Sequence, residues 1–207
     1  MKLQIAFDCT DLDQAITIAK EVAQHADILE IGSVLIYKYG EQAIKRFRDE
    51  FPQKTLLADA KIADRGKEAV TIFAQAGADW ITVMAGTGKN VIHIACTQAH
   101  SLGKKIILDL LDSSSLGQSA LEAQSLGVDA LLFHKPSDEE DQLSFLDRWE
   151  MVRGNTKLPI FVSMNITRDS INDILAIGPH AIIISKAIVS AQNPKSEAEF
   201  YSKVIKD

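Results

Sequence analysis

The chain has 207 residues, of which 46% are hydrophobic and 24% charged, so it is long enough to bury one sizeable core. Its formal net charge of −6 argues against nucleic acid and anionic membranes as partners, but does not exclude a small anionic ligand. No apolar run approaches the roughly 20 residues that span a bilayer, and we expect no signal peptide because the N-terminus lacks a long apolar segment.

Eight short apolar runs follow one another along the chain, separated by longer amphipathic stretches. Most of these runs are continuously apolar, which is typical of strands covered on both faces. The predicted strands are LQIAFD (3–8), DILEIG (27–32), TLLADAKI (55–62), DWITVMA (79–85), KIILDLL (105–111), DALLFHK (129–135), PIFVSMN (159–165) and HAIIISK (180–186).

Helices are predicted between the strands, because apolar residues there recur at intervals of three and four. The clearest patterns are LDQAITIAKEVAQHA (12–26), EQAIKRFRDEF (41–51), KEAVTIFAQAG (67–77) and NVIHIACTQAHSLG (90–103). A glycine that can form a left-handed C-cap ends several of the helical stretches. These glycines are Gly77, Gly103, Gly127 and Gly178.

Eight alternating β and α units predict a (β/α)₈ TIM barrel, built as a single domain over residues 1–207. An open doubly wound sheet is the competing α/β arrangement. A recurring junction favours the barrel: a helix end, a small residue, a polar residue and an apolar strand recur about every 50 residues. The polar residues are Asp27, Asp79, Asp129 and His180. The spacing suits pairs of units, although local rules at similar junctions could also produce it.

Polar residues near the C-terminal ends of barrel strands point into the active-site mouth. Six of the predicted strands contribute charged residues there, which favours a shared site over separate surface charges. The candidates are Asp8 on the first strand, Glu30 on the second, Asp59 and Lys61 on the third with Asp64 just beyond, Asp109 on the fifth, His134 and Lys135 on the sixth, and Ser185 and Lys186 on the eighth.

Asp59 and Lys61 are two residues apart on one strand, so their side chains share a face. A lysine held between carboxylates stays protonated and suits a developing oxyanion. The alternative is a ring of salt bridges that only closes the end of the barrel.

Glu30 and Asp59 lie on neighbouring predicted strands and are expected to face each other. Two carboxylates with added water molecules form a reasonable Mg²⁺ site, unless one of them only pairs with Lys61. His134 ends the sixth strand, where it can act as a general base, although a lone histidine can also be a hydrogen-bonded loop residue.

The stretch DAKIAD (59–64) carries the D-x-K-x-x-D motif and resembles the orotidine 5′-phosphate decarboxylase suprafamily. Its surroundings are similar to two branches, 3-hexulose-6-phosphate synthase and 3-keto-L-gulonate-6-phosphate decarboxylase. The matching segments are AFD (6–8), EIGSVLI (30–36), LADAKIADRG (57–66), AGADWITV (76–83), ILDLL (107–111) and FHKPSD (133–138).

This resemblance implies a lyase that acts on a phosphorylated sugar, in a homodimer with active sites at the subunit interface. Glu30 and Asp59 would bind Mg²⁺, and Lys61 would stabilise a cis-enediolate. Asp64 would reach into the neighbouring subunit's site.

Two positions favour the synthase branch, in which the strand-six histidine deprotonates ribulose 5-phosphate and the enediolate adds to formaldehyde. The decarboxylase typically has Glu on strand five and Arg after that histidine, where this chain has Asp109 and Ser137. The stretch ADAKIADRGK (58–67) is closer to the decarboxylase. Orotidine 5′-phosphate decarboxylase itself is disfavoured, because Glu30 occupies the position of its additional lysine on strand two.

The phosphate-binding segments depart from the family pattern. Family members have Gly-Gly after strand seven and Gly-Arg, or Gly with another residue, after strand eight, but this chain has SMNITRD (163–169) and ISKAI (184–188). Side chains there can block close approach to the backbone. The phosphate is then bound differently, the substrate differs, or activity is reduced, as in a non-catalytic sugar-phosphate-binding protein. The expected substrate-binding residues are Asp8, Asn165, Ser185 and Lys186.

The two cysteines, Cys9 and Cys96, are far apart and lack metal-site spacing. They provide no disulfide framework, so a reducing, cytoplasmic location is expected.

Overall fold

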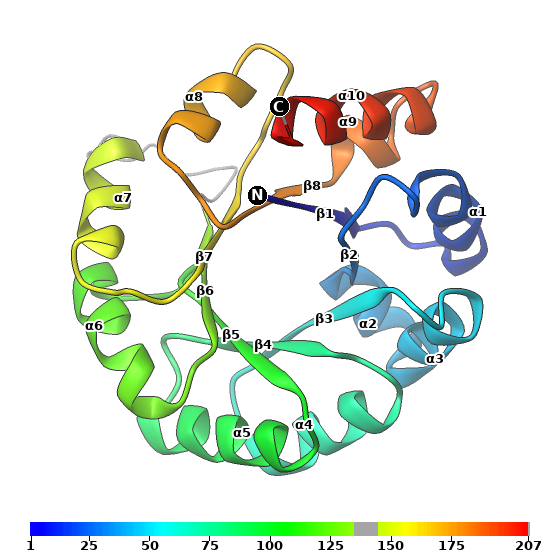
Figure 1. Cartoon of the computed structure of the whole chain (residues 1–207). Helices are drawn as coiled ribbons and strands as arrows, with labels where there is room; N and C mark the ends of the chain where they lie inside the picture. Colours follow the sequence, from blue (N-terminus) through cyan, green and yellow to red (C-terminus); the bar gives the residue numbers. More distant parts are fainter. Residues whose placement is uncertain (135–144, 207) are drawn as a thin grey trace.

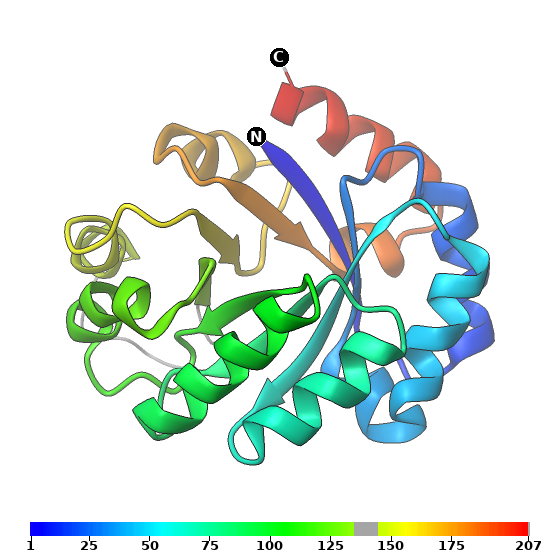
Figure 2. The same cartoon turned by 60° about the horizontal axis from the view of Figure 1, so that its bottom comes forward.

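The computed structural model describes residues 1–134 and 145–206. Eight parallel strands form a closed barrel in chain order, and β8 pairs with β1 (Figures 1 and 2). The strands are β1 Lys2–Phe7, β2 Ile28–Ile31, β3 Thr55–Ile62, β4 Trp80–Met84, β5 Lys105–Asp109, β6 Ala130–His134, β7 Ile160–Ser163 and β8 Ala181–Ile184. The predicted TIM barrel is confirmed, and the closed ring excludes an open doubly wound sheet.

Helices surround the barrel as an outer ring (Figure 1). They are α1 Leu12–Val22, α2 Ser33–Tyr39, α3 Glu41–Glu50, α4 Gly66–Gln75, α5 Lys89–Ser101, α6 Leu116–Leu126, α7 Phe145–Arg153, α8 Ile171–Ala176, α9 Lys186–Val189 and α10 Pro194–Lys206. The four glycines expected at helix ends all have positive φ angles. No helix within the described ranges is long and apolar enough to cross a membrane.

The strands bury both of their faces, which explains their continuously apolar sequences. On β3, for example, Leu57 belongs to a small cluster inside the barrel, whereas Ala58 belongs to the larger core between strands and helices. The inner cluster also contains Phe161 from β7, against which Trp80 packs with a ring-centroid distance of 5.7 Å. Side chains therefore fill the barrel below its mouth, and chemistry is confined to the open end.

The recurring aspartates have a structural role at the opposite, N-terminal end of the strands. Asp27, Asp79 and Asp129 each accept a hydrogen bond from a backbone N–H of the preceding strand, at 2.8 to 3.0 Å. The donors are Leu3, Leu56 and Ile106. At the fourth junction the shared contact is through the backbone: the N–H of His180 donates to the carbonyl oxygen of Ile160 at 2.8 Å, as the N–H groups of the three aspartates do to the carbonyl oxygens of their own donor residues. Each recurrence therefore marks the same kind of junction below an even-numbered strand.

Candidate active site

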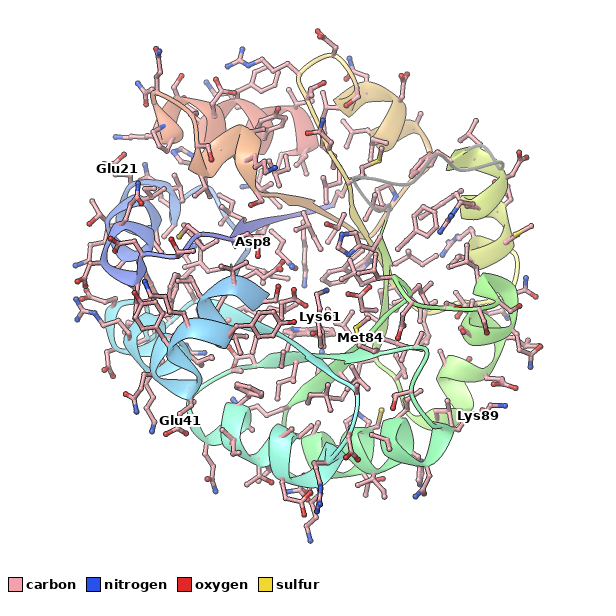
Figure 3. All side chains as sticks on the ribbon, turned by 180° about the vertical axis from the view of Figure 1, so that it is seen from behind. Asp8, Glu21, Glu41, Lys61, Met84 and Lys89 are labelled. Carbon is pink, nitrogen blue, oxygen red and sulfur yellow. The ribbon has the colours of Figure 1, made fainter. Side chains whose placement is uncertain are left out.

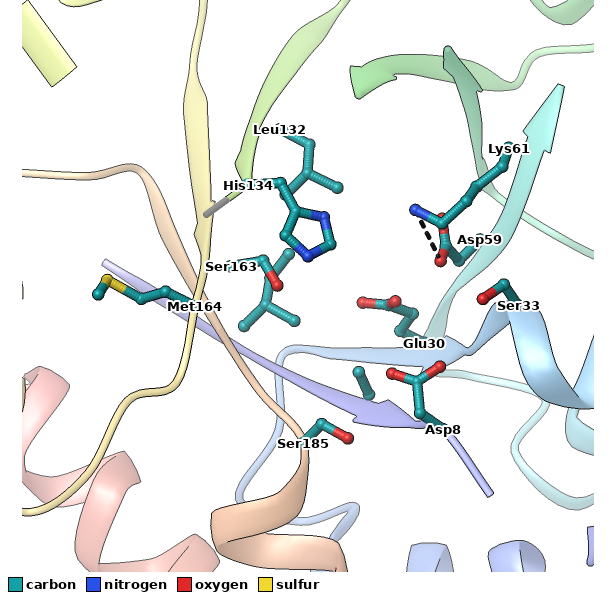
Figure 4. Close-up of a pocket in the computed structure, with 12 residues that line it drawn as sticks. Asp8, Glu30, Ser33, Asp59, Lys61, Leu132, His134, Ser163, Met164 and Ser185 are labelled. Atoms are coloured by element: carbon teal, nitrogen blue, oxygen red, sulfur yellow. Dashed lines mark ion pairs between the residues drawn. The ribbon is translucent and has the colours of Figure 1, made fainter. Parts of the chain in front are cut away.

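A pocket of about 250 Å³ opens at the C-terminal ends of the strands (Figure 4). Viewed from behind, Asp8 and Lys61 point toward the barrel axis, whereas Glu21, Glu41 and Lys89 lie on the outer helices (Figure 3). The pocket is lined by Ala6, Asp8, Glu30, Ser33, Asp59, Lys61, Leu132, His134, Ser163, Met164, Ile183 and Ser185. It therefore collects most of the predicted strand-end residues in one place.

Strand β3 bulges where it carries Asp59 and Lys61. Its register with β4 runs from Ala58 opposite Ile81 to Ile62 opposite Val83, so β3 contains additional residues at this point. Lys61 has a φ of 45°, which is uncommon for a residue other than glycine. Both side chains line the pocket, as their spacing of two predicted.

Lys61 is held between two buried carboxylates. Its Nζ lies 2.7 Å from Asp109 Oδ2 and 3.3 Å from Asp59 Oδ2. Burial alone would lower the pKa of Lys61, but Asp59 and Asp109 outweigh it and raise that pKa above its ordinary value. Burial opposes ionisation of Asp109 as well, but His134 and Lys61 lower the pKa of this carboxyl. The pair is therefore a charged ammonium and carboxylate near neutral pH.

The other carboxyl groups of the pocket carry an excess of negative charge. Burial, followed by repulsion from Asp59 and Asp8, raises the pKa of Glu30 well above its usual value. The pKa of Asp59 is also raised, mainly by burial, with Lys61 acting in the opposite direction. Gln4 donates a hydrogen bond to Glu30, and Thr82 donates one to Asp59. Because these donors are neutral, much of the repulsion among the carboxylates of Glu30, Asp59 and Asp8 stays uncompensated.

This donor set fits a hard divalent cation. Glu30 and Asp59 are each only 6% exposed, and a cation between their oxygens would offset both burial and repulsion. Within residues 1–134 and 145–206, no group of three or more His, Cys, Asp or Glu side chains is arranged to hold a metal ion. Mg²⁺ at this position would therefore take its remaining ligands from water or substrate, as Mg²⁺ commonly does.

His134 faces the acidic side of the pocket from β6 (Figure 4). Its Nδ1 lies 3.8 Å from Asp109 Oδ1, which is too long for a hydrogen bond, and this buried nitrogen has no hydrogen-bond partner among the residues that the structure describes. Contacts of this kind often tighten when substrate binds. Asp109 therefore lies between an ammonium that it already holds and an imidazole that it can orient.

A second hollow of about 410 Å³ adjoins the pocket beside β7 and β8. It shares Asp8, His134, Ser163, Met164 and Ser185 with the pocket. Its lining adds Asn165, Ile166, Ile184, Lys186 and Ala187. All four residues predicted to bind substrate therefore lie around one space.

Asp64, another predicted site residue, lines neither the pocket nor the second hollow. Its side chain is 83% exposed on the loop after β3 and contacts Arg65, with 3.9 Å between Asp64 Oδ2 and Arg65 Nε. Lys135 and Ser137 lie outside the described residues, so the distinction based on Ser137 stays a prediction.

The amino-acid sequence matches the orotidine 5′-phosphate decarboxylase / HUMPS family over residues 1–201. The chain belongs to this family. Among curated HUMPS relatives, 3-hexulose-6-phosphate synthase of Bacillus subtilis is 30% identical over 207 residues, covering 99% of each chain. The Staphylococcus aureus protein of the same name is 30% identical over 203 residues, covering 96% of each.

Solved structures of similar proteins share the barrel over nearly their whole lengths. The 3-hexulose-6-phosphate synthase of Salmonella typhimurium superposes with a TM-score of 0.93 at 30% identity, covering 100% of this chain and 99% of that one. The 3-keto-L-gulonate-6-phosphate decarboxylase of Vibrio cholerae gives 0.85 at 26% identity, covering 99% and 97%. The resemblance based on the D-x-K-x-x-D motif is thereby confirmed.

Several residues in or next to this pocket were not predicted from the sequence. Ser163 ends β7 and could have been found by the strand-end rule that identified Asp8. Ser33 belongs to α2, a short helix without a clear periodic signal. Gln4 and Thr82 are fully buried polar residues within strands. In the sequence, they are marked only as polar residues inside apolar runs. Their partners, Glu30 and Asp59, become apparent only in three dimensions.

Proposed function

We propose that the chain is a Mg²⁺-dependent carbon–carbon lyase that forms a cis-enediolate from a ketose phosphate. The specific reaction is that of 3-hexulose-6-phosphate synthase, the aldol addition of ribulose 5-phosphate to formaldehyde. The observation that carries the proposal is the Lys61 ammonium, held by Asp59 and Asp109 on the side of the pocket opposite His134. A fixed cation facing a potential base suits proton removal next to a carbonyl group.

In the proposed reaction, His134 removes a proton from carbon 1 of ribulose 5-phosphate. Lys61 stabilises the enediolate oxygens, and Asp109 keeps Lys61 charged and orients His134. Carbon 1 then attacks the formaldehyde carbon, and a carbon–carbon bond forms. The former formaldehyde oxygen takes up the proton that His134 returns, so atoms and charge balance.

Glu30 and Asp59 are the proposed Mg²⁺ ligands. When bound, Mg²⁺ would supply positive charge that stabilises the oxygens of the enediolate. The two carboxylates fit this role because each is buried with a raised pKa. Lys61 contributes a positive charge of its own next to Asp59.

The substrate phosphate is proposed to occupy the second hollow, beside Asn165, Ser185 and Lys186. The Lys186 ammonium can provide the charge, and the Asn165 amide and Ser185 hydroxyl can donate hydrogen bonds. Recognition would then depend on side chains in place of the backbone of glycines. Asp8, at the border of the two cavities, is placed to contact a sugar hydroxyl.

Decarboxylation of 3-keto-L-gulonate 6-phosphate is the alternative reaction, and it would use the same enediolate chemistry. It is supported by the decarboxylase of Vibrio cholerae among the similar structures. The synthase is favoured because relatives that are 30% identical over nearly the whole chain carry that name, and because strand five has Asp109 where the decarboxylase typically has Glu.

The deciding experiment assays the purified protein with Mg²⁺, ribulose 5-phosphate and formaldehyde, beside 3-keto-L-gulonate 6-phosphate alone. Formaldehyde consumption at around 1 s⁻¹ or faster is expected, and a chelator should abolish it. Carbon dioxide release in the second assay would assign the decarboxylase reaction. Binding of sugar phosphate without turnover in either assay would indicate a non-catalytic protein.

Lys61→Ala should lower kcat by about 10²–10³-fold or more while the melting temperature shows that the protein still folds. The matched control is Lys89→Ala, which removes an exposed lysine paired with Glu122 on the outer helices. Unchanged turnover in Lys61→Ala would remove Lys61 from the mechanism.

The proposal also includes a homodimer with shared active sites and a cytoplasmic location. Supporting observations are the exposed side chain of Asp64, which does not line the pocket of its own chain, and the two free cysteines.

A further inference from the structure

The bulge in β3 leaves a short stretch of backbone opposite one residue of β4. Ala58 pairs with Ile81 and Ile62 pairs with Val83, so Asp59, Ala60 and Lys61 face only Thr82. The regular backbone ladder cannot serve all three residues there. The backbone N–H of Lys61 instead donates a hydrogen bond to the Thr82 hydroxyl at 2.9 Å.

The same hydroxyl donates its proton to Asp59 Oδ1, also at 2.9 Å. One side chain therefore accepts from the backbone of Lys61 and donates to the side chain of Asp59. The second oxygen of Asp59, Oδ2, is then directed to Lys61 Nζ at 3.3 Å. A closed set of contacts thus joins the backbone of Lys61, the Thr82 hydroxyl, the Asp59 carboxylate and the Lys61 ammonium.

Packing alone would be met as well by an apolar residue. Thr82 is 0% exposed, and the inner cluster of the barrel consists of apolar side chains such as Leu57, Ile107 and Phe161. Valine has nearly the same shape as threonine and would suit such surroundings without a buried hydroxyl to satisfy. The hydroxyl is therefore explained by its two partners, both of which line the pocket.

We propose that Thr82 is a positioning residue that holds Asp59 and Lys61 in their working arrangement. The inference rests on the proposed function, in which Asp59 binds the metal ion and Lys61 stabilises the enediolate. Thr82 itself does not line the pocket and acts only through these two neighbours.

Thr82→Val tests this by removing the hydroxyl while keeping the shape. We expect kcat to fall by about 10- to 100-fold, the usual effect of removing a supporting partner of a site residue. KM should stay unchanged, because the second hollow is untouched. Thr82→Ser keeps the hydroxyl and should retain most of the wild-type kcat. Thr71→Val is the control, since its hydroxyl bonds Lys67 and Gln98 on the outer helices.

Amide hydrogen exchange provides a readout that does not depend on turnover. The Lys61 amide should exchange faster in Thr82→Val than in wild type or Thr82→Ser, because its acceptor is lost. Unchanged exchange in Thr82→Val would overturn the proposal whatever the activity, and so would an equal loss of kcat in the serine variant or the Thr71→Val control. Absence of turnover in the wild type would instead contradict the proposed function. The exchange measurement would still test whether Thr82 holds the backbone of Lys61.

Discussion

Lys61 combines a backbone conformation that is uncommon for lysine with a buried charge. Its φ of 45° falls in the left-handed region, where most side chains are strained. Such a conformation persists only when its surroundings determine it, and here three side chains do so. Thr82 binds the Lys61 backbone, and Asp59 and Asp109 bind its ammonium. The strain and the candidate chemistry therefore occur at the same residue.

Gly32 allows the close approach of Asp8 at the mouth of the barrel. An added Cβ would lie 2.1 Å from Asp8 Oδ1 and 2.7 Å from the carbonyl oxygen of Phe7. Gly32→Ala should therefore displace Asp8, raise KM, and lower the free energy of unfolding by about 1–3 kcal/mol. Urea denaturation and steady-state kinetics would measure the two effects.

Gly88→Ala is the matched control for this substitution. A Cβ at Gly88 would meet nothing within 4 Å, and its φ of −62° suits alanine. We expect unchanged kinetics and a free energy of unfolding within about 1 kcal/mol of wild type, because alanine restricts the unfolded chain but is a poorer N-cap than glycine. If both variants behave alike, the close contact between Gly32 and Asp8 affects neither KM nor the free energy of unfolding.

At the scale of elements, Asp79 connects the start of β4 to three other parts of the barrel wall. It accepts hydrogen bonds from the Leu56 backbone of β3 at 3.0 Å, from Arg48 of α3 at 2.6 Å and from Lys104 before β5 at 3.0 Å. Arg48 also donates to the carbonyl oxygen of Gly77 at 2.7 Å. This network is far from the mouth, so it is expected to affect stability and not catalysis.

Asp79→Asn should therefore destabilise the protein in a pH-dependent way. Burial alone would raise the pKa of Asp79, but its bonds with Leu56, Lys104 and Arg48 outweigh burial and lower that pKa below 3.8. The folded state thus binds fewer protons than the unfolded state in this range, so the stabilisation is complete above the ordinary pKa and is lost as pH falls through the folded pKa.

We expect a loss of about 1–2 kcal/mol at neutral pH, because the group is partly exposed and solvent screens it. The difference from wild type should shrink below about pH 4. Denaturant unfolding at a series of pH values would measure it. Asp27→Asn is the comparison, since Asp27 accepts the equivalent backbone hydrogen bond. A pH-independent difference for Asp79→Asn would contradict the role of its charge.

At the scale of the whole molecule, the position of Asp64 bears on assembly. Its side chain is 83% exposed and does not line the pocket of its own chain. If Asp64 completes the site of a partner subunit, mixed dimers of Lys61→Ala and Asp64→Asn contain one intact site. Each variant alone should be nearly inactive, whereas unfolding and refolding an equal mixture should restore about one quarter of wild-type activity.

The mixture is compared with the two variants refolded separately. Activity equal to the average of the separate samples would mean that Asp64 acts within its own chain or not at all. Light scattering on the wild type would show independently whether the chain is a dimer.

The sequence by itself determined the barrel and most of the site. Buried parallel strands have continuously apolar sequences, and a strand order that closes into a barrel brings every C-terminal strand end to one mouth. Asp8, Glu30, Asp59, Lys61, Asp109, His134 and Ser185 could therefore be assigned to one site without coordinates, and all of them line the pocket or contact its residues.

Only the tertiary structure decided how these groups are arranged. The bulge at Asp59 and Lys61 depends on the register between β3 and β4, which neither strand specifies alone. The role of Thr82 follows from that register, because the register places its hydroxyl within hydrogen-bond distance of the Lys61 backbone and the Asp59 carboxylate. The charge states of Glu30 and Lys61 likewise depend on burial and on neighbours from other strands. Periodicity reports which face a side chain occupies, whereas distances between strands arise only when the barrel closes.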